Sequence, residues 1–353
     1  MTFKSRMNKL PVTRDNPAMD TLQAALSLVF RPLLVLKDHP VLFKCKDVYI
    51  VTAGLINSVA AVLSLVCALY FYKALFPVET ADGSWVWKLA MVPFFSLFFS
   101  KAFHVVALGR EFLRNPKKYL GETAFYNQGG QFGVLFGTIW FSVVTGINFL
   151  ACMDINLLGG CLALTLGRVG CYSYGCCHGR RTSSRFAVVY THPQTKVLRV
   201  FPELANVPLV PTQLISAAYN LLLFLAMLWA LSLSPKAGMV SAFFILAYNG
   251  FRIFIERYRL SVINVSTKKI WMQFYMRVAA LFAGFGAIYL LFVLWTQAPR
   301  LSFADPLTLG EYFSWVTSQP QAVAAVVITF AVYMLTWGMH YKKMGQHFQW
   351  HRV

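Results

Sequence analysis

The sequence predicts an all-α fold, a polytopic bundle of membrane helices with about eight spans. Of the 353 residues 58% are hydrophobic and only 13% are charged, and the mean hydropathy is +0.56. These values exclude an ordinary water-soluble globular protein. Five stretches without Asp, Glu, Lys or Arg are long enough, at about 1.5 Å per helical residue, to cross the apolar part of a bilayer. They are Val48–Tyr72, Gly129–Met153, Leu204–Pro235, Val278–Pro299 and Gln319–Tyr341.

Three further apolar segments are each interrupted by one cation and bring the expected number of spans to eight. With these boundaries Asp154 falls in a loop between two spans. The segments are Leu89–Leu108 with Lys101, Ile155–Gly175 with Arg168, and Ala237–Ile255 with Arg252.

The net charge of +19 is distributed unevenly over the predicted loops. When loops are assigned alternately to the two sides of the bundle, one side receives 24 Lys and Arg and the other receives four. Basic residues collect in cytoplasmic loops, so we expect both termini on the cytoplasmic side, in a bacterial cell (inner) membrane. The excess charge then faces membrane lipids, and no nucleic-acid partner is expected.

Three regions are expected along the chain. Residues 1–47 form a basic N-terminal segment with an interfacial helix over Met19–Leu36. Residues 48–298 form the transmembrane core, and residues 299–353 add a C-terminal span and a basic tail.

Charges inside a bilayer are expensive unless they face a cavity or a partner, so the interrupted spans are candidate sites. For Lys101 the alternative is that its side chain reaches the interface. For Arg252 the alternative is an ion pair with Glu256, one helical turn later. Arg168 is preceded by thirteen uncharged residues and followed by eleven. The two arginines therefore mark the predicted working site.

The segment around Arg168 is rich in glycine and predicts a helix that breaks. Gly167, Gly170, Gly175 and Gly179 all lie within thirteen residues, and each glycine costs about 1 kcal/mol relative to alanine inside a helix. Broken helices at membrane depth line cavities, and free backbone N–H groups beside an arginine bind anions. Because the planar guanidinium suits paired phosphate oxygens, a phosphate-bearing lipid head is the expected ligand.

Other polar and small residues stand at span starts. Gly129, Gly133 and Gly137 recur every fourth residue, which also fits close packing of two helices. The amides Asn127, Gln128 and Gln131 lie beside Gly129 at the start of one span, and Gln213 lies at the start of another.

Cysteine and histidine cluster only at Cys171, Cys176, Cys177 and His178. Thiolate and imidazole are metal ligands, but this spacing matches no usual closed site, so neither a metal nor another cofactor is expected. A reactive thiolate next to arginines and small, close-packed filler are the remaining interpretations.

The order of these elements resembles the prolipoprotein diacylglyceryl transferase family, over roughly Lys101 to Arg259. Gln128-Gly129-Gly130 resembles its His-Gly-Gly element, with Gln128 in place of the histidine. Gly167-Arg168-Val169-Gly170-Cys171 through Gly179 resembles its Gly-Arg-x-Gly-Asn motif, with Cys171 for the asparagine and Cys176 for a glutamate. Pro211-Thr212-Gln213-Leu214 and the Tyr248 to Glu256 helix resemble two further elements.

The resemblance implies a membrane-embedded transferase that moves a diacylglyceryl group from an anionic glycerophospholipid such as phosphatidylglycerol. Prolipoprotein cysteine is the acceptor in the family, while the acceptor here is unidentified. A lipid transporter and a non-catalytic lipid-binding protein are the alternatives. The implied catalytic residues are Arg168, Arg252, His178 and Gln128, and the implied substrate-binding residues are Lys101, Gly129, Gly130, Gly170, Cys171, Cys176, Gly179, Gln213 and Glu256.

Overall fold

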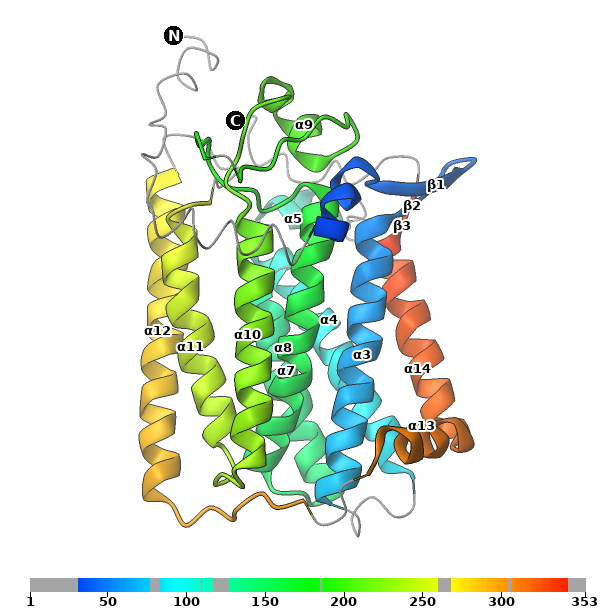
Figure 1. Cartoon of the computed structure of the whole chain (residues 1–353), viewed down its shortest axis with the longest axis vertical. Helices are drawn as coiled ribbons and strands as arrows, with labels where there is room; N and C mark the ends of the chain where they lie inside the picture. Colours follow the sequence, from blue (N-terminus) through cyan, green and yellow to red (C-terminus); the bar gives the residue numbers. More distant parts are fainter. Residues whose placement is uncertain are drawn as a thin grey trace.

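A bundle of long helices running along one common direction makes up most of the molecule (Figure 1). The computed structural model describes residues 31–76, 83–108, 110–116, 127–184, 186–259, 268–303 and 307–341. The long helices in these residues are α3 (Thr52–Leu75), α4 (Trp85–Leu108), α7 (Asn127–Thr145), α8 (Phe149–Tyr174), α10 (Thr212–Ser232), α11 (Met239–Glu256), α12 (Lys268–Trp295) and α14 (Pro320–Tyr333), which a π-helical turn, η3 (Met334–Gly338), continues.

The polytopic all-α prediction is confirmed by the length and composition of these helices. Seven of the helices in the described residues are long and apolar enough to cross a membrane. The eighth, α7, is apolar over the shorter segment Gly129–Thr145. Each of the eight predicted spans therefore corresponds to one helix, with shifted boundaries.

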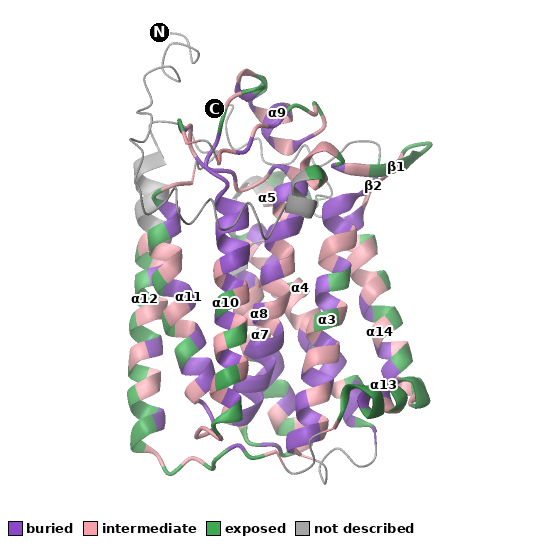
Figure 2. Cartoon of the chain, in the orientation of Figure 1, coloured by how far each residue is buried: buried purple, intermediate pink, exposed green. Residues whose placement is uncertain are grey.

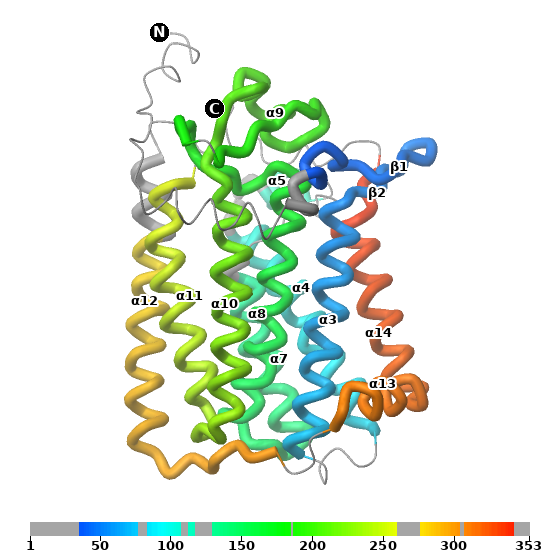
Figure 3. The backbone as a smooth tube through the Cα atoms, in the orientation of Figure 1, coloured from blue at the N-terminus to red at the C-terminus, as the bar shows by residue number. Residues whose placement is uncertain are grey.

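The two ends of the bundle differ in structure (Figure 1). One end carries the short helices α5 (Arg110–Arg114) and α9 (Lys196–Val200), together with η2 (Pro202–Leu204) and a small sheet. At the opposite end α13 (Leu309–Ser318) lies across the bundle, and the Thr308 side chain and Glu311 cap it reciprocally. The tube in Figure 3 shows the same arrangement of the chain at both ends.

The small sheet was not predicted. It is antiparallel in the order β1 (Val41–Cys45), β2 (Val48–Val51) and β3 (Met339–Tyr341). Val48 pairs with both Cys45 and Tyr341. Residues 48–51 are therefore strand, not the start of the first span. Of the predicted interfacial helix only the end is described, where Arg31–Asp38 forms the 3-10 helix η1; the rest lies outside the described residues.

The centre of the bundle is α8, and α12 lies at its edge. In the most apolar window of α8 61% of the residues are buried, compared with 17% in α12 (Figure 2). A helix with a broad apolar surface and few buried residues is typical of a lipid-facing position. The central helix α8 therefore places Arg168 among other helices and not toward lipid.

Glycines let α4 and α7 approach each other closely. A Cβ atom on Gly129 would lie 2.3 Å from the carbonyl oxygen of Phe99, and one on Gly133 would lie 2.4 Å from that of Phe95. Small residues at such contacts allow close backbone packing in membranes. The packing interpretation of these glycines is confirmed.

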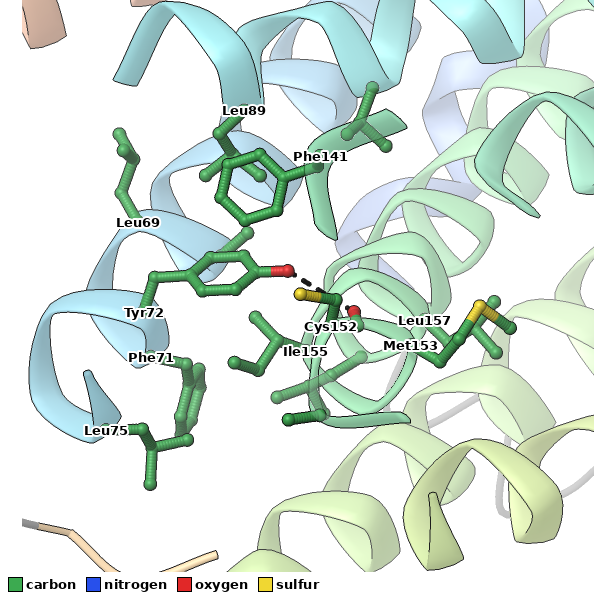
Figure 4. Close-up of a cluster of buried hydrophobic side chains, with 14 of the residues drawn as sticks. Leu69, Phe71, Tyr72, Leu75, Leu89, Phe141, Cys152, Met153, Ile155 and Leu157 are labelled. Carbon is green, nitrogen blue, oxygen red and sulfur yellow. Dashed lines mark hydrogen bonds between the residues drawn. The ribbon is translucent and has the colours of Figure 1, made fainter. Parts of the chain in front are cut away.

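A buried aromatic and aliphatic cluster joins α3, α4, α7 and α8 near the end that carries α13 (Figure 4). Tyr72 packs on Phe141, with ring centroids 4.7 Å apart. Its hydroxyl donates to the backbone carbonyl of Cys152 at 3.3 Å, so the buried polar tip has a partner. This cluster fixes the start of α8.

Asp154 lies inside α8, which corrects its predicted place in a loop. The chain breaks earlier, at Gly146 with φ +76°, and the Asn148 side chain caps α8 by accepting from the N–H groups of Leu150 and Ala151. Fully buried, Asp154 accepts hydrogen bonds from the N–H groups of Gly238 (2.7 Å) and Ser241 (2.6 Å). A carboxylate at the first turn of a helix satisfies free N–H groups there. The hydrogen bonds of Asp154 thus hold the start of α11 against α8.

The C-terminal helix α14 packs against α3 and α4. A Cβ atom on Gly54 would lie 2.0 Å from the Cα of Gly338, so α3 and η3 meet backbone to backbone. Just beyond this contact β3 pairs with β2. Residues 320–341 are therefore packed into the same bundle as the predicted core.

Candidate functional site

Arg168 lies near the end of α8 that carries the sheet and α9. Arg168 is only 9% exposed. Among the described residues it makes no hydrogen bond and no ion pair. A buried guanidinium without an acceptor is unfavourable, so this cation is suited to an anionic ligand.

The break predicted around Arg168 does not occur at Gly167 or Gly170, which lie within α8; the helix continues to Tyr174 and ends at Gly175. Gly175 adopts a left-handed conformation with φ +73°, and its N–H donates to the carbonyls of Cys171 and Tyr172. A left-handed glycine after the last turn ends helices because it has no Cβ penalty. The chain then turns back over the end of the bundle.

The returning segment is held by the start of α10. The Thr212 hydroxyl donates to the carbonyl of Cys177 and the Gln213 amide to that of Cys176, both at 2.7 Å. Gln213 also donates to the Tyr190 hydroxyl at 3.2 Å. These bonds direct the Gln213 amide at the loop backbone, and the substrate-binding role implied for Gln213 remains a prediction.

The end of α11 contributes a second group of charges. Arg252 Nη2 lies 2.5 Å from the Glu256 carboxylate, so the ion pair one helical turn apart forms. Arg259 binds the same carboxylate oxygen from the following turn. Gly179 forms an isolated bridge with Arg259, which joins the loop after α8 to the end of α11.

These charges form one cluster. The charge of Arg168 interacts with that of Arg259, and the charge of Arg252 interacts with those of both other arginines. Glu256 is the acidic partner within this group, and it is 4% exposed. Among the described residues, three arginines and one carboxylate leave an excess of two positive charges in a largely buried space, and an anion would offset it.

The three cysteines that lie close together in the sequence also meet in space. The Sγ atoms of Cys171, Cys176 and Cys177 lie within 4.8 Å of one another. Hydrogen bonds with Cys171 and Cys176 hold the pKa of the Cys177 thiol well below its usual range, and the charges of Arg259 and Arg168 act in the same direction. The pKa of the Cys176 thiol is instead raised well above its usual range, chiefly by a hydrogen bond with Cys171.

His178 is buried in the loop next to these thiols. Its Nδ1 lies 3.1 Å from the Gly179 carbonyl, and its ring meets Phe201 edge to face. Burial lowers the pKa of His178 to about 4, so the imidazole is neutral at pH 7. Its catalytic role remains a prediction.

The glycines assigned to substrate binding all have packing partners. A Cβ atom on Gly179 would lie 2.4 Å from the Val210 carbonyl oxygen, one on Gly170 3.2 Å from that of Ala53, and one on Gly130 2.9 Å from the Ser100 hydroxyl. Gly129 packs on α4, as described above. These contacts explain why glycine stands at those positions, and roles in substrate binding remain predictions.

Two polar residues of the predicted site lie on α4 and α7. Lys101 is half-buried on α4. Gln128 is the second residue of α7, and its side chain lies outside the described part of the structure. The α4 and α7 pair therefore brings both positions to the same end as Arg168 (Figure 1).

Sequence reasoning missed Arg259 as a member of the cluster. It was counted as a loop residue, although Arg252, Glu256 and Arg259 are spaced by four and three residues. Residues at this spacing would share one helix face, and this pattern was the available signal. In the structure α11 ends at Glu256, and Arg259 binds that carboxylate from beyond the helix.

The fold and the site define a class: a multi-pass helical membrane protein with a buried arginine cluster at one end of its bundle. The family model of prolipoprotein diacylglyceryl transferase matches residues 40–296. Because the match covers more than half of the chain, the chain belongs to this family.

Curated relatives match over shorter segments. A phosphatidylglycerol--prolipoprotein diacylglyceryl transferase of Oleidesulfovibrio alaskensis is 31% identical over 153 residues, 42% of this chain and 52% of the relative. The enzyme numbered 2 of Clostridium perfringens is 26% identical over 158 residues, 44% and 59% respectively. One of Dehalococcoides mccartyi is 27% identical over 165 residues, 47% and 61%. The chain thus matches about three fifths or less of the length of these relatives.

Proposed function

We propose that the protein transfers a diacylglyceryl group from an anionic glycerophospholipid, phosphatidylglycerol or a close analogue, to a thiol acceptor. The observation that carries the proposal is Arg168, a buried cation without an acceptor among the described residues, beside the charged end of α11. The relatives' printed names supply the donor and the prolipoprotein acceptor as the precedent.

The reaction follows from where the positive charge is placed. The acceptor sulfur, as a thiolate, attacks the glycerol carbon that bears the phosphate ester. The new C–S bond forms as the C–O bond breaks, and the electron pair leaves on the phosphate oxygen. The thiol proton is released to water before the attack, since nearby cations favour thiolate. The products are a thioether and a glycerol phosphate.

The three arginines act on the leaving group. Negative charge grows on the phosphate oxygen as the C–O bond breaks, and cationic donors fixed in a water-poor site stabilise that charge most when it develops. Arg252 and Arg259 are held by Glu256, so their guanidinium groups are oriented before the lipid binds. Arg168 is the group left to bind the phosphate directly.

The same arrangement favours an orientation in a bacterial inner membrane with both termini in the cytoplasm. The helices α5 and α9 and the loop after α8, whose sequences are basic, lie at one end of the bundle, the end of the arginine cluster (Figure 1). Basic residues gather on the cytoplasmic side of membrane proteins. A cytoplasmic site would receive an acceptor that has not been exported.

The test is transfer of label from radioactive phosphatidylglycerol to a cysteine-containing acceptor peptide, with the full chain in proteoliposomes. Arg168→Lys keeps the charge and loses the paired donors, and we expect transfer to fall by about 100-fold, the scale of removing one transition-state donor. Arg277→Lys, at the start of the apolar part of α12 (Met276–Trp295), is the matched control and should leave transfer unchanged. Equal transfer by Arg168→Lys and wild type would refute the role of Arg168.

A separate measurement distinguishes catalysis from binding alone, because Gln128 stands where the family has a histidine. Lipid extracts of cells with and without the protein are compared by mass spectrometry. A new diacylglyceryl product supports the transferase. Retention of phosphatidylglycerol by the purified protein without any product would identify a non-catalytic lipid-binding protein.

A further inference from the structure

We propose that Cys171, Cys176 and Cys177 form a binding site for one thiophilic metal cation, of the zinc or copper(I) class. The inference starts from the packing of the three sulfur atoms, all within 4.8 Å of one another. It does not depend on the transferase activity.

The backbone brings together thiols that the sequence spacing alone does not. Cys171 is in the last turn of α8, and the left-handed Gly175 reverses the chain so that Cys176 and Cys177 return toward it. The Cys176 N–H donates to the Cys171 carbonyl at 3.1 Å. The prediction of no metal rested on the spacing, which does not include this reversal.

The loop holds its cysteines in a fixed and strained conformation. Cys177 has φ +57°, a region that residues other than glycine seldom adopt. Bonds from Thr212 and Gln213 to the carbonyls of Cys177 and Cys176 keep the turn in place. Strain of this kind persists where surrounding contacts enforce it, and it is concentrated at ligand sites.

The distances suit a single metal ion. Zn–S bonds of about 2.3 Å place thiolates on one tetrahedral zinc about 3.8 Å apart. Sulfurs within 4.8 Å reach that separation by small side-chain rotations. Thiolates prefer zinc and copper(I) among the cations that proteins bind, whereas carboxylates, which suit harder cations, are not among the three ligands.

The surrounding charge suits a negatively charged metal–thiolate group. In the described part of the chain, three arginines and Glu256 leave two excess positive charges beside the cysteines. Three thiolates with one zinc ion carry a net charge of −1. That charge offsets half of the excess positive charge. Binding forms metal–sulfur bonds and releases the thiol protons to solvent.

The test measures zinc directly on the reduced full-length protein in detergent. After equilibration with zinc and removal of the excess, we expect one zinc per chain in the wild type. Cys171→Ser, Cys176→Ser and Cys177→Ser should each weaken zinc binding by at least ten-fold. The matched controls Cys67→Ser and Cys161→Ser, on α3 and in the middle of α8, should bind as the wild type does.

A second readout needs no variant. Cobalt added to the wild type should produce a sulfur-to-cobalt charge-transfer absorption that zinc abolishes. The proposal is overturned if the reduced wild type binds no zinc and gives no such absorption, or if the control variants lose zinc equally. A protein mass lower by two hydrogens, without metal in the reduced sample, would instead indicate a disulfide and would also overturn it. The zinc and cobalt measurements can be interpreted whether or not the protein transfers lipid.

Discussion

Two buried charges on α8, one near each end, have opposite surroundings. Asp154 accepts from two backbone N–H groups at the start of α11, and no part of it is exposed. Arg168 is almost as deeply buried and has no acceptor among the described residues. A buried charge with its hydrogen bonds complete stabilises the fold, while one without them lowers stability until a ligand arrives. The comparison separates a structural charge from the proposed binding charge on the same helix.

The largest expected change in stability comes from replacing Asp154, the buried charge that has hydrogen-bond partners. Asp154→Ala leaves the N–H groups of Gly238 and Ser241 buried without partners, and each such group costs about 1–3 kcal/mol. We therefore expect a loss of about 2–6 kcal/mol in the free energy of unfolding, measured by denaturant titration in mixed micelles. Unchanged stability would remove the structural half of the comparison.

Replacing Arg168 should change stability in the opposite direction. Arg168→Met removes a buried cation that has no acceptor in the described part of the chain and keeps similar side-chain volume, and we expect stability to rise by about 1–3 kcal/mol. Phosphatidylglycerol should stabilise the wild type against heat and should not stabilise this variant, because a ligand raises stability only in a protein that binds it. Thermal unfolding with and without the lipid measures both. A destabilised variant that still responds to lipid would contradict the binding role.

The smallest effect tests how much of the Asp154 contact is backbone. The Ser241 hydroxyl contacts the Gly238 carbonyl and the Tyr289 hydroxyl, whereas Asp154 accepts from the Ser241 N–H. Ser241→Ala keeps that N–H, so we expect a loss of about 1 kcal/mol, the value of one hydrogen bond. A loss as large as that of Asp154→Ala would show that the hydroxyl, not the backbone, fastens α11.

Much of this comparison could be predicted from the sequence. Cations in apolar runs identified Arg168 and Arg252 because an uncompensated charge in a membrane is rare. The ion pair of Arg252 with Glu256 followed from helical spacing. Of the glycines that predicted a break around Arg168, Gly175 ends α8, whereas Gly167 and Gly170 lie within the helix. For the arginines and the ion pair, the pattern of residues along one helix was sufficient.

Long-range contacts explain what could not be predicted. Asp154 was placed in a loop because the uncharged run ends there, and nothing in the run shows that its partners are Gly238 and Ser241, more than eighty residues later. The true break was signalled by Gly146 and the capping residue Asn148. Likewise, the meeting of three cysteines depends on the reversal after α8 and on contacts from α10.

The pairing of β2 with β3 has a consequence for how the chain is completed. Val48 precedes the first membrane helix, and its partner Tyr341 follows the last one in the described residues. Chain segments so distant in sequence pair slowly, because the intervening chain must be ordered first. During synthesis β2 can pair with β3 only after the helices between them have been inserted. We therefore expect this strand pair to form last in folding, and β3, which lies beyond the family match that ends at residue 296, to be needed for it.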